Sequence, residues 1–366
     1  MSQKFEALSQ RTSLALTNMR GMAALIVMLA HLEVFGRYIP WVMKYIPLDP
    51  VAIFFFISGL LIPMSLEKYG VKAFIQHRFF RLFPVLVTWS IVHFALDGLN
   101  GFSLQEFKSF LATSSLSFDM LSLTPQTVVY WTLAVEVHMY VLVALLYAYN
   151  PKQPMMRIVY GVSSLLLLAY AVACLTGHEL FISLTSRNLS CILLIFMGTA
   201  LLEKEKKWLH SGVLALLYAF SVLCCTQKGF LSAIDLRSIY FLVDVKDYAT
   251  LTGWSTKTYG GMLVRVVSFL FFLCGLRFFT VEHEILRFFA NISYPLYLSH
   301  LTIGGLIGTS SGLGILASCV VSVLFAWMIH KFVELPWMQK AKQYTQAYAQ
   351  KHLTRKGSAQ PSVRSV

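Results

Sequence analysis

Residues 19–31 read Met-Arg-Gly-Met-Ala-Ala-Leu-Ile-Val-Met-Leu-Ala-His, an apolar stretch that contains one arginine and one histidine. It opens a longer apolar segment, residues 19–36, which has about the length that a helix needs to cross a bilayer. Arg20 and His31 are eleven residues apart, so both side chains lie on one helix face, roughly 16 Å apart along the axis. Ionisable groups at membrane depth are costly and mostly line a cavity or a substrate path. The pair therefore predicts an active site within the bilayer.

The rest of the chain repeats this apolar pattern. Hydrophobic residues make up 57% of the sequence and charged residues 13%, with a mean hydropathy of +0.65, outside the usual balance of soluble proteins. The sequence therefore predicts an all-α, polytopic integral membrane protein with about ten transmembrane helices. The third and sixth segments are the shortest. The ten segments are 19–36, 48–66, 84–98, 128–149, 157–175, 188–202, 209–226, 258–280, 289–309 and 311–333.

The net charge of +13 is distributed as in a membrane protein. With a cytoplasmic N-terminus, 21 of the 30 Lys and Arg residues fall on cytoplasmic stretches and helix ends, and eight fall in outer loops. This asymmetry follows the positive-inside rule, puts both termini in the cytoplasm and argues against a nucleic-acid partner. Residues 1–18 are polar and have no small-residue cleavage site, so the first segment is expected to be an uncleaved anchor. The predicted units are the N-terminal segment 1–18, a membrane domain 19–337 and a basic cytoplasmic tail 338–366, which is expected to be solvated or to bind lipid headgroups.

Three segments between the apolar runs have a distinctive composition. The predicted outer loops 99–127 and 227–257 mix polar and aromatic residues, which suits a sugar-like acceptor but equally suits interfacial anchoring. On the cytoplasmic side, residues 71–83 combine basic and aromatic residues, a pattern typical of an amphipathic helix that lies in the interface.

Arg78 and Arg81 lie within that amphipathic segment, three residues apart, so both guanidinium groups project from one side of a helix. Forked donors that keep their charge are suited to binding phosphates. Together with Arg20, at the cytoplasmic end of the first segment, they can form a basic mouth for a phosphorylated donor. Anchoring against lipid headgroups is the alternative explanation, and the Arg-x-x-Arg spacing does not decide between the two.

His31 and Glu136 are the other candidate catalytic residues. An imidazole can remove a proton from an attacking hydroxyl at neutral pH, although a histidine that only bonds two helices together is the alternative for His31. Glu33 follows two residues later and faces away from His31, so it is no obvious partner. Glu136 lies inside the fourth segment, where a carboxylate needs a partner from another helix. It is expected to orient His31 or to hold substrate, and a structural ion pair is the alternative.

Other motifs are absent or lack their context. Residues 308–312 match Gly-x-Ser-x-Gly but occupy a short turn between two apolar segments, without the strand and helix of a hydrolase elbow. The six cysteines show no metal-ligand spacing, and there is no zinc-protease, P-loop or dinucleotide motif. We therefore expect no metal and no tightly bound cofactor.

Six short motifs occur in a fixed order along the chain. They are Arg20-Gly21-x-Ala23-Ala24-Leu25 followed by His31, Phe54-Phe55-Phe56-Ile57-Ser58-Gly59, Arg78-x-x-Arg81-Leu82-Phe83-Pro84, Trp131-Thr132-Leu133-Ala134-Val135-Glu136, Tyr294-Pro295-Leu296-Tyr297-Leu298-Ser299-His300 and Glu334-Leu335-Pro336. With these motifs the chain from about Asn18 to Trp337 resembles acyltransferase family 3, the ten-span membrane O-acyltransferases that include bacterial O-antigen and exopolysaccharide O-acetyltransferases. Two positions depart from the family pattern: Val137 stands where many members carry a second acidic residue, and Ser299 where an aromatic is common.

The resemblance implies an O-acyltransferase of the bacterial inner membrane. Such an enzyme would move an acyl group, expected to be acetyl, from cytoplasmic acyl-CoA to a hydroxyl of an envelope glycan or its lipid-linked precursor. Arg78 and Arg81 would then bind the phosphates of the donor, assisted by Arg20. His31 would act as general base or transient acyl carrier, and Glu136 would orient a nearby basic group.

Two other classes of function remain open from the sequence. Buried Arg, His and Glu also suit a secondary transporter or flippase for a glycan or lipid intermediate, although an inverted repeat and paired broken helices are missing. A non-catalytic scaffold for envelope assembly explains the loops but leaves the charges inside the membrane unexplained.

Overall fold

The computed structural model describes residues 3–39, 48–101, 103–116, 125–127, 129–151, 153–176, 179–203, 206–227 and 259–344. These residues form helices and turns and contain no strand, which confirms the all-α prediction. The predicted outer loop beyond Gln227 and the basic tail beyond Tyr344 lie outside the described residues. The helices are α1 (Gln3–His31), α2 (Val34–Tyr38), α4 (Pro50–Asp97), α5 (Leu104–Ser114), α6 (Tyr130–Tyr149), α7 (Met155–Thr176), α8 (Glu179–Ala200), α9 (Lys207–Gln227), α12 (Tyr259–Phe278), α13 (Glu284–Ile307) and α14 (Gly312–Ile329), with a 3₁₀ turn at Gly98–Asn100 and a π-helical turn at His330–Glu334.

Each of the ten predicted segments overlaps one or more of these helices. Five described helical stretches are long and apolar enough to cross a membrane: Arg11–His31, Pro50–Asp97, Tyr130–Tyr149, Met155–Ala173 and Gly312–Tyr344. The protein is thus a polytopic helical membrane protein, while the number of ten spans stays a prediction. The polar residues ahead of the first segment are helical as well, since α1 begins at Gln3.

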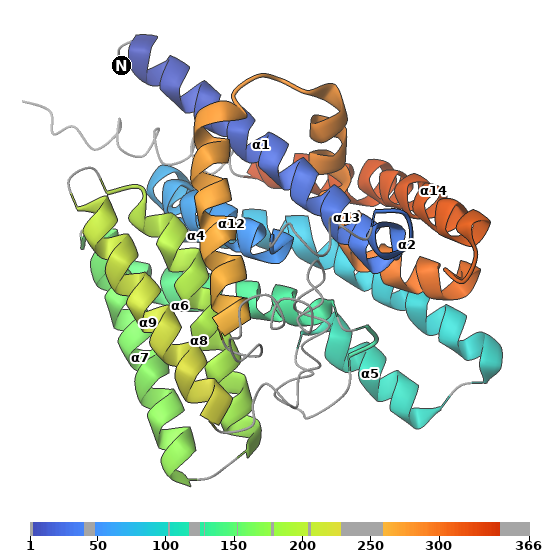
Figure 1. The fold of residues 1–366 in the computed structure, drawn as a ribbon, viewed down its shortest axis with the longest axis horizontal. Coiled ribbons are helices and arrows are strands. Elements are labelled where there is room, and N and C mark those ends of the chain that lie inside the picture. The colour runs from blue at the N-terminus through green and yellow to red at the C-terminus, as the bar shows by residue number, and fades with distance from the viewer. Residues whose placement is uncertain are drawn as a thin grey trace, which may run out of the picture.

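α1 and α13 lie side by side and run in the same direction (Figure 1). Arg20 bonds to the carbonyl of Ala290, and eleven residues further on, His31 meets His300. The helices approach closely because Gly21 has no side chain, and a Cβ there would collide with the carbonyl of Leu286. Small residues at such contacts allow backbones to approach each other inside a membrane.

α4 combines two predicted spans and the segment between them in one long kinked helix. Gly70 interrupts it with φ +74° and ψ 170°, a conformation that glycine adopts without steric cost. The helix then continues without a break from Val71 to Asp97. Residues 71–83 are therefore helical as predicted, but they form the first turns of the third segment rather than a separate interfacial helix.

α7, α8 and α9 pack into a bundle on one side of α4 (Figure 1). α8 packs closely against the backbone of α4. The Thr199 hydroxyl on α8 donates to the backbone carbonyl of Gly59 on α4 at 2.8 Å. A Cβ on Gly59 would meet the carbonyl of Ile195, and one on Gly198 would meet that of Phe56. This contact fixes the part of α4 that carries Ser58 against the bundle, so α4 can present its opposite side to α1, α6 and α13.

Candidate active site

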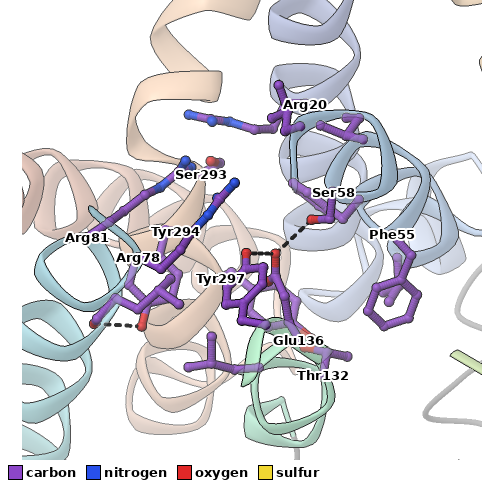
Figure 2. Close-up of a pocket in the computed structure, with 17 residues that line it drawn as sticks. Arg20, Phe55, Ser58, Arg78, Arg81, Thr132, Glu136, Ser293, Tyr294 and Tyr297 are labelled. Carbon is purple, nitrogen blue, oxygen red and sulfur yellow. Dashed lines mark hydrogen bonds between the residues drawn. The ribbon is translucent and has the colours of Figure 1, made fainter. Parts of the chain in front are cut away.

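A cavity opens where α1, α4, α6 and α13 meet (Figure 2). Its wall combines aromatic and aliphatic side chains with a small number of charged and hydroxyl groups, as in most small-molecule sites. Four of the five predicted site residues line it: Arg20, Arg78, Arg81 and Glu136. The complete lining is Arg20, Val51, Phe54, Phe55, Ile57, Ser58, Leu61, Arg78, Arg81, Leu82, Thr132, Leu133, Glu136, Tyr140, Ser293, Tyr294 and Tyr297.

Arg20 reaches the cavity from α1 and is held by the backbone of α13. Its Nε donates to the carbonyl of Ala290 at 3.1 Å, and its Nη2 donates to the same oxygen. Ser293 Oγ donates to that carbonyl as well, at 2.8 Å. The Arg20 side chain is therefore bonded to a neutral acceptor, and no carboxylate of the described residues is in direct contact with it.

Arg78 and Arg81 enter the cavity from α4, after the kink at Gly70. The guanidinium carbon of Arg78 lies 5.3 Å from the ring centroid of Phe74 and 4.9 Å from that of Tyr140. A guanidinium that lies over an aromatic ring in this way gains about 0.5–2 kcal/mol from the ring quadrupole. Two rings therefore fix the direction of Arg78 and leave its N–H donors available for an anion.

Glu136 accepts two hydrogen bonds at one of its oxygens. Ser58 Oγ donates to Oε1 at 2.7 Å, and the hydroxyl of Tyr140, one helical turn further along α6, donates to the same atom. Neither of these two partners is a histidine, so the hydrogen bonds to Oε1 do not join Glu136 to His31. The carboxylate is instead coupled to Arg78 through Tyr140, whose ring contacts the guanidinium while its hydroxyl bonds to Glu136.

The cavity lining carries more positive than negative charge: three arginines and one glutamate. Figure 2 shows that Arg20, Arg78 and Arg81 converge on one end of the cavity, with Glu136 nearby. The acidic groups whose charges act on Arg20 are Glu334 and Glu136. Among the described residues, none of the three arginines forms an ion pair with a carboxylate within 4 Å. Three convergent guanidinium groups with this little compensation make a site for an anion with several oxygens.

Several functional positions had no role in the sequence analysis. Tyr297 on α13 shares a hydrogen bond of 2.9 Å with the Thr132 hydroxyl on α6, and Tyr294 donates to the Leu82 carbonyl at 2.9 Å. Both bonds tie α13 to the other walls of the cavity. These residues, like Ser58, belong to the six motifs quoted above, so the motifs contained the signal. Their partners depend on how distant helices pack, which the sequence does not reveal.

His31 is not part of the cavity wall. It lies at the C-terminal end of α1, where its Nδ1 meets Nε2 of His300 on α13. The ring of His300 lies 6.1 Å from the ring of Tyr297, which does line the cavity. The structure therefore separates the predicted site residues: the three arginines and Glu136 line the cavity, whereas His31 lies beside it in contact with His300.

The described residues thus form a polytopic helical membrane protein with a cavity lined by three arginines and a glutamate. The chain belongs to the acyltransferase 3 family, whose acyltransferase domain model matches residues 13–331, and it is therefore an acyltransferase. No curated protein and no solved structure matches the chain. Family membership confirms the resemblance drawn from the six motifs and favours the enzyme over the transporter and the scaffold.

Proposed function

We propose that the protein is an O-acyltransferase that moves an acetyl group from cytoplasmic acetyl-CoA, or another acyl-CoA, to a hydroxyl of an envelope glycan or its lipid-linked precursor. The observation that carries the proposal is the convergence of Arg20, Arg78 and Arg81 on one cavity inside the helix assembly of an acyltransferase. The diphosphate and 3′-phosphate of an acyl-CoA supply the several anionic oxygens that such a group of forked donors binds best.

A second cavity supports entry of the donor beside α1. It shares Arg20, Ile57 and Leu61 with the first and continues along the α1 residues Thr12 to Thr17 toward Met64. Under the proposed orientation this direction leads to the cytoplasm. An acyl-CoA arriving from that side meets Arg20 first and the arginines of α4 next.

The spacing of Arg20 and His31 fits the shape of the donor. Eleven residues of helix correspond to roughly 16 Å. The pantetheine arm between the diphosphate and the sulfur advances about 14 Å when extended, taking about 3.5 Å for every three bonds of an extended chain. A donor whose phosphates are bound near Arg20 therefore places its thioester at the level of His31.

His31 is the proposed general base. The alternative role for His31 is that of a transient acyl carrier. As base, it takes the proton from the acceptor hydroxyl while the oxygen attacks the thioester carbonyl. The new C–O bond forms, the C–S bond breaks, and the proton passes from His31 to the leaving thiolate. The products are the acyl ester and free CoA thiol, so atoms and charges balance.

Glu136 acts on the donor site rather than on His31. Its carboxylate partly balances the three arginines and, through Tyr140, keeps Arg78 in position. We place Glu136 in the active site as a positioning residue for the arginine group.

The proposed arrangement has ten spans, both termini in the cytoplasm and a location in the bacterial inner membrane. The parallel packing of α1 and α13 supports it, because these helices contain the first and ninth predicted segments. In an alternating ten-span topology, odd-numbered segments all cross in the same direction. The positive-inside distribution of Lys and Arg gives the same orientation.

Inverted membrane vesicles, which expose the cytoplasmic face, provide the direct test. We expect label from [¹⁴C]acetyl-CoA to enter the glycan fraction of vesicles that contain the protein and not of vesicles that lack it. His31→Ala is expected to abolish the label without changing the amount of inserted protein. Label confined to phospholipid, or an absence of thioester-dependent label, would contradict the proposed acceptor class.

A further inference from the structure

His31 and His300 form a histidine pair between the parallel helices α1 and α13. Their ring planes are within 3° of parallel, their centroids are 4.7 Å apart, and they meet through His31 Nδ1 and His300 Nε2. His300 is completely buried, with 0% of its surface exposed. No group of three or more His, Cys, Asp or Glu side chains that could hold a metal ion is present in the described part of the chain.

We propose that His300 is the positioning residue for His31: it fixes the tautomer and the ring orientation in which His31 Nε2 carries the lone pair. This inference rests on the proposed function, in which His31 is the general base, and it assigns the group that prepares that base for catalysis.

The positions of the protons on both imidazoles follow from the hydrogen bond between His300 and the backbone carbonyl of Leu296. His300 Nδ1 lies 2.8 Å from the backbone oxygen of Leu296, and a carbonyl oxygen only accepts, so Nδ1 of His300 carries a proton. In a neutral imidazole the other nitrogen then has the lone pair, so His300 Nε2 accepts from His31 Nδ1. His31 Nδ1 thus carries a proton as well, and the lone pair of His31 is left on Nε2.

This arrangement serves catalysis in two ways. A base is useful only in the tautomer whose lone pair points at the proton to be removed, and the partner at the other ring nitrogen selects that tautomer. When His31 takes up the proton of the acceptor hydroxyl, both of its nitrogens become donors. His300 Nε2 remains available as acceptor for the Nδ1 proton, so the hydrogen bond persists in the charged state. A neutral histidine here has the orienting role that a carboxylate has in a Ser-His-Asp triad.

The fold supplies the rigidity that such a role requires. Tyr297, one turn before His300 on the same helix, is bonded to Thr132 across the cavity. Arg20 bonds to Ala290 further back along both helices, and Gly21 keeps the two backbones in close contact. A shift of His300 relative to His31 would therefore have to move the whole α1–α13 contact.

Two amide substitutions at one position separate positioning from packing. In His300→Gln the amide oxygen reaches about as far as Nε2 did and can accept from His31, whereas the shorter amide of His300→Asn reaches Leu296 but not His31. The measurements are kcat and the KM for [¹⁴C]acetyl-CoA, with the purified protein in nanodiscs and glycan from a deletion strain as acceptor. Ser299→Ala, a neighbouring buried position outside the active site, is the control and is expected to keep full activity.

We expect His300→Asn to lower kcat by about 10²-fold or more, the range of a lost general base, with an unchanged KM for acetyl-CoA. His300→Gln is expected to restore most of that loss. Equal kcat values for the two amide variants, whether both high or both low, overturn the inference, and so does a loss that appears in KM alone. His31→Ala is measured in parallel: if it stays active, the base assignment in the proposed function fails, whereas an inactive His31→Ala with an active His300→Asn refutes only the positioning role.

Discussion

The guanidinium of Arg78 lies over the ring of Tyr140, with 4.9 Å between its carbon and the ring centroid, and this contact directs a cation from α4 into a cavity shared with α6. The same tyrosine donates its hydroxyl to Glu136. One side chain therefore couples Arg78 to the carboxylate at the cavity wall.

Substitutions of Tyr140 can separate these two contacts. Tyr140→Phe keeps the ring under Arg78 and loses the bond to Glu136, whereas Tyr140→Leu loses both. Since a cation–π contact contributes about 0.5–2 kcal/mol, we expect Tyr140→Leu to raise the KM for acetyl-CoA by about 2- to 30-fold and Tyr140→Phe to raise it less. Initial rates at varied acetyl-CoA concentration measure the difference. A larger KM for the phenylalanine variant than for the leucine variant would remove Arg78 from the donor site.

Arg78 and Arg81 are expected to act through their forked geometry and not through charge alone. Changing both to lysine keeps the charge but removes paired donors, and each lost charge-assisted hydrogen bond costs about 1.5–3 kcal/mol. We therefore expect the KM for acetyl-CoA to rise by at least about tenfold, with kcat at saturation much less affected. Arg157→Lys, on the exposed start of α7, is the matched control. A double variant that behaves like this control would show that the pair only anchors the protein to headgroups.

The contact between α4 and α8 depends on the absence of a side chain at Gly59. A Cβ there would collide with the carbonyl of Ile195, which is part of a helix backbone and cannot move aside easily. We expect Gly59→Ala to lower the free energy of unfolding by about 1–3 kcal/mol. Gly305→Ala, on exposed α13 surface with nothing within 4 Å of the new Cβ, is expected to be neutral or slightly stabilising. Thermal unfolding in detergent compares the two, and equal melting temperatures would refute the close-packing argument.

A second stability prediction concerns Asp49 and Arg265, a buried pair between α4 and α12. Arg265 Nε lies 3.5 Å from Asp49 Oδ2, and the other carboxylate oxygen caps α4 by accepting from Val51 and Ala52. Arg265→Met would leave this carboxylate buried without its cation, which costs about 3–5 kcal/mol. Adding Asp49→Asn is expected to recover part of that loss, because asparagine also caps a helix and carries no charge. Unfolding of the single and double variants by SDS tests this, and a double variant less stable than Arg265→Met would contradict it.

Physical reasons explain which parts of the fold and of the candidate site could be predicted from the sequence. Arg20 and Glu136 were predicted as site residues because a charge inside an apolar segment is costly unless a cavity or ligand uses it. Arg78 and Arg81 were predicted because two forked donors on one side of a helix suit phosphates. All four residues line one cavity. The apolar segments likewise predicted the helices, since length and hydrophobicity are local properties. The join between the interfacial segment and the third span was missed, because the helix that follows the kink at Gly70 continues through Pro84 to Asp97 without interruption.

The partners of these residues could not be predicted. His31 was identified as a candidate base, but its contact with His300 joins residues 269 positions apart and depends on α1 and α13 running in parallel. The partners of Glu136 were not predicted for the same reason: they are Ser58 on α4 and a tyrosine one turn along its own helix. Charge alone shows that a buried group needs a partner, and packing decides which one it takes.

Mass spectrometry of the envelope glycans from three otherwise identical strains tests the central claim most directly. The strains are the wild type, a deletion of the gene and His31→Ala at a matched protein level. We predict that one acyl mass disappears from the same glycan in both altered strains, which would also identify the acceptor. Glycans that keep every acyl group in the deletion strain, or a His31→Ala strain that matches the wild type, would contradict the account.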